Sequence, residues 1–366
     1  MRALAFLTGL LLIAVVLWDA FETVILPRTV TRRFRLARLY FRGTWPPFAR
    51  LARRIRSDGR RERFLAVYGP LSSLGLLLVW AAGQVLGFAL LQFGAGSRLA
   101  TPGGVATFSD DLYMSGTTFF TLGLGDVYPA APLSRFLASV EAGMGFAFLA
   151  VDIAYFPVLY QSFSRREVRL TLLDAWAGSP PSAGEVLRRL AAANELKALD
   201  AFLRDWEYWC SEVLESHISY PVLAYYRSQH QRESWVSALT SMLDLTALVA
   251  VGIEGAPKWQ AHVTFAIARH TAVDLSQVLG VTPDVVHDRL PPQDLQRLRR
   301  HLDEAGVRLA DGAEFDARLI ELRHSYEPFV CGLSRRLIVP LPDWWRERPT
   351  PDNWQSSPKL AGGKHL

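Results

Sequence analysis

The sequence predicts an all-α membrane protein that carries a soluble helical domain in its C-terminal half. Three observations lead to this fold class. Half of the 366 residues are apolar, and the apolar residues are concentrated in three blocks within residues 1–163. Thirteen arginines follow the first block, and the chain becomes polar and helix-rich from about residue 164. This division indicates a membrane part followed by a soluble part.

The first block, residues 1–27, is long enough for a membrane-spanning helix, which needs about 20 residues. A cleaved signal peptide is the alternative, but no small-x-small cleavage site follows the apolar core. We therefore expect an N-terminal transmembrane helix. Asp19 and Glu22 share one face of this helix, where they either pair with cations of the next segment or lie at the membrane interface.

Residues 28–63 form an arginine-rich linker that determines the topology. It holds thirteen arginines and only two acidic residues, so the positive-inside rule places it in the cytoplasm and the N-terminus outside a plasma membrane. Arginines beside a membrane also attract anionic lipid headgroups. The net charge of +5 comes largely from this one stretch, so the composition does not indicate a nucleic-acid partner.

The second span, residues 64–93, then runs outward, and the third, residues 132–163, returns inward. Between them, Ser109, Asp110 and Asp111 offer capping oxygens for a short helix from Leu112 to about Phe120. A glycine-rich segment follows. Non-helical backbone survives at membrane depth only where it is buried in protein or lines a water-filled path, so we expect a re-entrant helix and loop over residues 109–126.

Residues 115–129 read SGTTFFTLGLGDVYP. This stretch closely resembles the pore signature of potassium channels, usually written TTVGYGD with a proline soon after. The resemblance covers about residues 64–163 and implies a pore domain made of an outer helix (64–93), a pore helix and filter (109–126) and an inner helix (132–163). One filter sequence lines one quarter of such a pore, so a homotetramer is implied.

The resemblance implies that K⁺ is the permeant ion, that no other cofactor is needed and that the protein is not an enzyme. Carbonyls facing one axis need alternating backbone handedness, which glycine adopts at low cost, so Gly123 and Gly125 have a physical reason to be glycine. The residues that would coordinate K⁺ are Thr121, Leu122, Gly123 and Leu124. The residues that would support the filter are Gly125, Asp126, Thr117, Thr118 and Tyr113.

Three residues depart from the family pattern. Leu124 stands where tyrosine is commonest, Phe120 replaces the usual threonine, and Thr117 occupies the position of a bracing glutamate in some members. Coordination by the main chain does not depend on these side chains. The rigidity of the filter, and with it the K⁺ over Na⁺ selectivity, does depend on them.

The third span resembles the inner helix of the family, with Gly143 and Gly145 as candidate hinge or close-packing residues. Counting from the filter places one helix face toward the ion pathway. The residues of this cavity-lining face are Phe146, Leu149, Ile153 and Pro157. The candidate cation-attracting acids are Asp152 and Glu141, since ionisable residues inside a membrane are functional candidates.

Residues 164–348 read as a cytoplasmic helical domain, and residues 349–366 as a disordered tail. Residues 235–253 are apolar, but their hydroxyls and Asp244 favour a buried helix over a fourth span. A helix-turn-helix pattern over residues 274–286 carries acids where DNA phosphates would lie. We expect a channel; the alternative is a membrane-anchored sensor or hydrolase whose activity lies in the helical domain.

Overall fold

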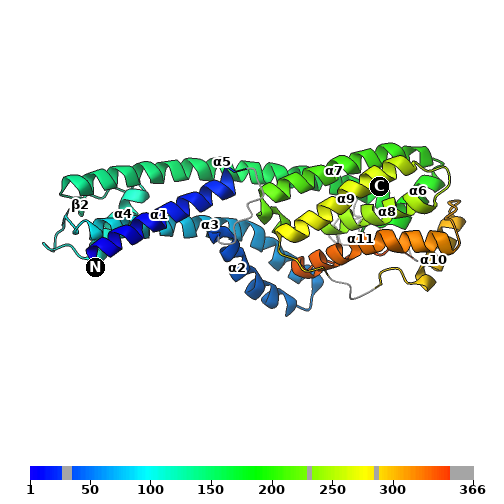
Figure 1. The fold of residues 1–366 in the computed structure, drawn as a ribbon, viewed down its shortest axis with the longest axis horizontal. Coiled ribbons are helices and arrows are strands. Elements are labelled where there is room, and N and C mark those ends of the chain that lie inside the picture. Colours follow the sequence, from blue (N-terminus) through cyan, green and yellow to red (C-terminus); the bar gives the residue numbers. More distant parts are fainter. Residues whose placement is uncertain (27–34, 229–232, 284–287, 347–366) are drawn as a thin grey trace, which may run out of the picture. The chain divides into compact units, whose positions relative to one another are not determined.

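A computed structural model describes most of the chain (Figure 1). The described residues are 1–26, 35–228, 233–283 and 288–346. They form two compact units, Met1–Gln161 and Ser162–Leu366. The predicted disordered tail and the acidic end of the helix-turn-helix pattern lie outside the described residues.

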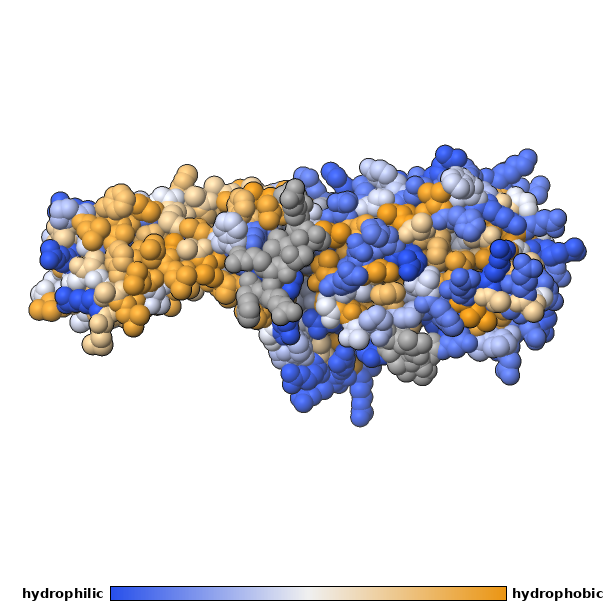
Figure 2. All heavy atoms as spheres, in the orientation of Figure 1, coloured by the Kyte–Doolittle hydropathy of each residue, from blue (hydrophilic) through white to orange (hydrophobic). Residues whose placement is uncertain are grey.

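Within residues 1–26 and 35–161, the first unit holds four helices, a two-stranded sheet and the beginning of a fifth helix. Strand β1 (Leu99–Ala100) pairs antiparallel with β2 (Tyr128–Pro129). The helices are α1 (Arg2–Val24), α2 (Leu36–Arg53), α3 (Asp58–Gly94), α4 (Phe108–Phe119) and α5 (Pro132–Ala177). Of these, α1, α3 and α5 are long and apolar enough to cross a membrane. In Figure 2 the visible face of α1 and of the first part of α5 is mostly hydrophobic, as a lipid-facing surface would be.

Helix α1 packs closely on α3 through glycines. A Cβ atom on Gly9 would lie 2.5 Å from the Gly87 carbonyl oxygen, and one on Gly83 would lie 2.8 Å from the Val16 side chain. Gly83 and Gly87 are four residues apart and so share one helix face, as in the small-residue seams of membrane helix pairs. The backbones of α1 and α3 therefore approach one another more closely than larger side chains would allow.

The arginine-rich linker contains a helix, α2, which the sequence did not predict. The Asp19 carboxylate of α1 accepts hydrogen bonds from the Ala37 amide at 3.0 Å and from the Trp80 indole at 2.9 Å. Glu22 lies 3.5 Å from Arg35. Of the two alternatives for the acids of α1, the structure shows pairing with the next segment. Asp19 thereby occupies the place of a capping residue for α2.

Two predicted boundaries of the long helices were wrong. The outer helix α3 begins at Asp58, six residues before the predicted start, and the inner helix α5 continues to Ala177 instead of ending at residue 163. The change from apolar to polar residues near Ser164 marks a change of surroundings along α5. It does not mark a helix end, because no glycine or proline stands there.

The second unit is a bundle of helices. It begins with the last part of α5, and α8 (Trp235–Gly252) packs on α9 and α11. Although α8 is apolar enough to span a membrane, 94% of its apolar window is buried within the protein, as expected for a core helix. The other elements are α6 (Ala183–Ala192), η1 (Leu196–Ala198), α7 (Leu199–Ser219), η2 (Pro221–Tyr225), α9 (Lys258–Val278), α10 (Pro292–Glu304) and α11 (Ala313–Leu337).

Candidate functional site

The site begins with the short helix α4, whose first turn is fixed by a capping box. The Asp110 carboxylate accepts hydrogen bonds from the Thr107 amide at 2.8 Å and the Thr107 hydroxyl at 2.7 Å. This places the helix start at Phe108, four residues before the predicted start at Leu112. The signal was present in the sequence as threonine followed three residues later by an acid.

Ser115 connects α4 to both long helices that flank it. Its hydroxyl lies 2.7 Å from the Val85 carbonyl oxygen of α3 and also contacts the Glu141 carboxylate of α5. Glu141 is fully buried. One of the two candidate acids therefore holds the pore helix in place, on the side of α5 away from the predicted cavity-lining face.

Helix α4 ends in a Schellman motif that leads into the filter segment, residues 121–126. The Thr121 amide donates to the Thr118 carbonyl at 3.0 Å, and the Leu122 amide donates to the Thr117 carbonyl at 2.8 Å. Thr121, the first residue after the helix end in this motif, has a left-handed φ of 57°. Glycine normally occupies this position, because a Cβ atom is strained there. Thr117 and Thr118, which are predicted to support the filter, accept these two bonds through their carbonyl oxygens.

Every second residue of the filter segment has a positive φ. The values are 57° at Thr121, 55° at Gly123 and 78° at Gly125. A Cβ atom on either glycine would meet nothing within 4 Å, so the glycines are required by backbone conformation and not by lack of space. The side chains of Leu122 and Leu124 are 63% and 64% exposed in the single chain. Such alternation lets successive carbonyl groups share one side of the strand.

The C-terminal end of the filter segment is held at two points. The Tyr113 hydroxyl donates to the Asp126 carboxylate at 2.9 Å, which joins α4 directly to the end of the filter. Beyond it, Tyr128 and Pro129 pair with β1, and the Ala130 amide donates to the Arg98 carbonyl at 3.0 Å. The Tyr113–Asp126 bond ties this segment to α4, although Leu124 lacks the hydroxyl of the commoner tyrosine.

The inner helix presents its predicted cavity-lining residues to the outside of the single chain. All four, Phe146, Leu149, Ile153 and Pro157, are exposed. Gly145 lies against the Phe119 carbonyl at the end of α4 and leaves no room for a Cβ atom, whereas Gly143 has open space around it. Gly145 is therefore a packing glycine, and a hinge at either position stays a prediction.

Asp152 lies apart from Glu141 and from the cavity-lining face. It borders a separate cavity between α5 and α1, which also involves Gln84 of α3. The cavity could not be predicted from the sequence, because its shape depends on how α1 packs against α3 and α5. The glycine spacing of α3 predicts a close helix contact, but it does not identify the partner helix.

Residues 75–161 match a family model described as an ion channel. Among curated proteins, the chain is 22% identical over 202 residues to the uncharacterized membrane protein YdjJ of Bacillus subtilis (strain 168), covering 54% of this chain and 57% of YdjJ. It is 33% identical over 93 residues to protein LctB of Geobacillus stearothermophilus, covering 23% of this chain and 69% of LctB. No solved structure matches the chain. With two flanking helices that are apolar enough to span a membrane, a short helix and a glycine-rich loop in one unit, the chain belongs to the pore-loop ion channel family.

Proposed function

We propose that this protein is a potassium-selective channel in which four copies of the chain surround one pore. The observation that carries the proposal is the alternating backbone of the filter segment, with left-handed φ at Thr121, Gly123 and Gly125. Carbonyl oxygens of Thr121, Leu122, Gly123 and Leu124 would replace the water shell of K⁺. Each chain supplies one such segment, so four chains are needed to surround the ion.

The proposed orientation places the N-terminus outside the plasma membrane and the helical domain in the cytoplasm. The arginines of α2 and its flanks support this orientation, because positive charge is retained on the cytoplasmic side. The same arginines would attract anionic lipids. Helix α2 supports this role, because it buries Trp45, Ala49 and Ala52 along one face, while Arg38, Arg50 and Arg53 are exposed.

The decisive experiment is K⁺ flux into liposomes that contain the purified protein. We expect Gly123→Ala to abolish flux while the protein still assembles, because an L residue is strained at a φ of 55° and would turn a coordinating carbonyl. Gly104→Ala is the matched control. Gly104 also has a positive φ, 85°, and open space around it, but it lies outside the filter segment.

Normal flux in Gly104→Ala and none in Gly123→Ala would support the proposed filter. Unaltered flux in Gly123→Ala would contradict it. Replacing external K⁺ by Na⁺ in the same assay measures selectivity, and we expect Na⁺ to enter much more slowly. Equal entry of the two ions would leave an ion channel without the proposed K⁺ selectivity.

A further inference from the structure

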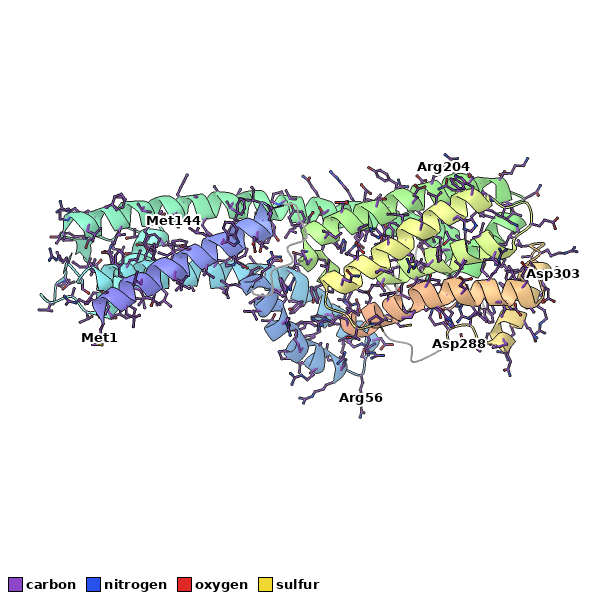
Figure 3. All side chains as sticks on the ribbon, in the orientation of Figure 1. Met1, Arg56, Met144, Arg204, Asp288 and Asp303 are labelled. Carbon is purple, nitrogen blue, oxygen red and sulfur yellow. The ribbon has the colours of Figure 1, made fainter. Side chains whose placement is uncertain are left out.

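A cavity of about 260 Å³, open on one side, lies between α1, α3, the end of α4 and α5 of the first unit. Met144 of α5, labelled in Figure 3, lines it and also packs on the cluster that contains Ile13 of α1. The walls are largely aromatic and aliphatic. They include Val16, Phe21, Trp80, Phe119, Phe148 and Val151. This cavity is separate from the filter segment. It also lies on a different face of α5 from Phe146, Leu149, Ile153 and Pro157, the residues predicted to line the ion pathway.

Two polar side chains border this apolar space with atoms that lack partners. Gln84 is 2% exposed, and neither its amide nitrogen nor its amide oxygen has a hydrogen-bond partner among the described residues. The same holds for Oδ1 of Asp152. A buried polar atom left unpaired destabilises the folded protein, and a charged group does so more strongly. An occupant that donates hydrogen bonds to the two oxygens, Oε1 of Gln84 and Oδ1 of Asp152, would remove part of this penalty.

The size and chemistry of the cavity define the occupant. Engineered cavities of roughly 150 Å³ hold benzene, and drug-sized ligands need about 300 Å³ or more. This cavity lies between the two and fits one ring with a short chain. The Asp152 carboxylate and the Gln84 amide oxygen both accept hydrogen bonds, and an ammonium group has three donors. The aromatic walls suit a ring, and their faces attract a cation.

We propose that this cavity is a binding site for a small amphiphilic amine, whose ammonium group pairs with Asp152 and Gln84 and whose apolar body lies against Trp80, Phe119 and Phe148. The site depends on α1, because Val16, Ala20 and Phe21 form one wall. The proposal concerns binding only, so it holds or fails independently of the ion that the protein conducts.

The test is photo-crosslinking of the purified full-length protein in detergent with 4-phenylbutylamine that carries a diazirine on its ring. We expect saturable labelling of peptides from α1 and α5. Asp152→Asn should raise the half-saturating concentration about tenfold or more, because a charge-assisted hydrogen bond is lost. The alcohol analogue of the probe, which lacks the ammonium charge, should bind the unaltered protein about as weakly as the amine binds Asp152→Asn.

Two tryptophan substitutions on α1 form a matched pair. Ala20→Trp fills the cavity and should abolish labelling, whereas Ala14→Trp adds the same bulk to an exposed face of the helix and should leave labelling unchanged. Melting temperatures of the variants show that each is folded. Labelling that spreads over all lipid-facing helices and persists in Ala20→Trp would overturn the proposal. Equal half-saturation of the unaltered protein and Asp152→Asn would also overturn it.

Discussion

At the scale of single residues, Thr121 combines two roles that oppose one another. It occupies the left-handed position of the Schellman motif at the end of α4, where a β-branched residue is strained by about 1–2 kcal/mol. It is also the first proposed K⁺ ligand and the one with a side-chain hydroxyl. The strain is consistent with a residue kept for ion binding at the expense of stability.

We predict that Thr121→Gly raises the free energy of unfolding by up to about 1 kcal/mol, and with it the melting temperature. We also predict that this substitution lowers K⁺ flux. The glycine relieves the strain but removes the hydroxyl. Ile338→Gly is the control, because Ile338 caps α11 with a φ of 56° and lies far along the chain from the filter. It should gain stability without a change in flux. A loss of stability in Thr121→Gly would contradict this account of the strain.

A second prediction at this scale concerns the hydroxyl of Tyr113. Tyr113→Phe removes its 2.9 Å bond to Asp126 and so frees the end of the filter segment that this bond holds. We expect a lower K⁺ over Na⁺ flux ratio in liposomes. Tyr208→Phe, at a 61% exposed tyrosine of α7, should leave the ratio unchanged. An unchanged ratio in Tyr113→Phe would show that the strand pair alone holds the filter.

At the scale of elements, the last part of α5 is fixed within the second unit by Arg166. Its guanidinium donates to the carbonyl oxygens of Leu223 at 3.0 Å and Tyr226 at 2.8 Å, and it lies 3.1 Å from Nε2 of His217 on α7. Glu167 balances the charge at 3.0 Å. Burial, and secondly the charge of Arg166, lower the pKa of His217 well below its usual value.

This environment predicts that acid destabilises the second unit. Below pH of about 6.5 the unfolded chain protonates His217 while the folded chain leaves it neutral, so stability falls as pH falls, by up to about 1.4 kcal/mol per pH unit. His217→Gln keeps an acceptor for Arg166 and should show a smaller drop in melting temperature between pH 7.5 and 5.5. His262→Gln, at an exposed histidine of α9, should behave like the unaltered protein. Equal drops in melting temperature for the unaltered protein, His217→Gln and His262→Gln would contradict the prediction.

The elements also show how far the sequence determines the fold. The left-handed backbone at Gly123 and Gly125, the two long apolar helices that flank it and the buried helix α8 were predictable, because each has a local pattern of composition or spacing. Helix α2 was not predictable, because Pro46 and Pro47 lie inside it and two adjacent prolines suggest that a helix is broken there. The cavity beside Asp152 was not predictable either. It arises from contacts between segments that are distant in sequence.

At the scale of the whole molecule, side chains of the filter segment and of the inner helix α5 are exposed in the single chain. Leu122, Leu124, Phe146 and Ile153 are each at least 63% exposed. In a closed ring of identical chains these residues would face the common axis or a neighbouring copy.

A closed ring of four chains predicts how many chains share one pore. Expressing unaltered and variant chains together can measure this number. If one defective filter disables a pore of four chains, then equal amounts of unaltered and Gly123→Ala chains, expressed together, should retain about 6% of the flux. A dimer with one filter from each chain would retain about 25%, and independent single-chain pores about half. Mixing after separate purification is the control, because preformed assemblies should then retain about half of the flux. Retention near half after co-expression would contradict the tetramer.

The two hydrogen bonds that Asp19 accepts through one oxygen, Oδ2, lead to a prediction about evolution. This oxygen serves the amide of Ala37 and the indole of Trp80 together, so the first helix, the arginine-rich helix and the outer helix meet at one acceptor. A homologue that lacks the first helix has no such acceptor and is free to lose the indole at position 80. Among homologues that keep the helix, an acid at position 19 and a tryptophan at position 80 should be inherited as a pair, and this co-variation can be read from sequences alone.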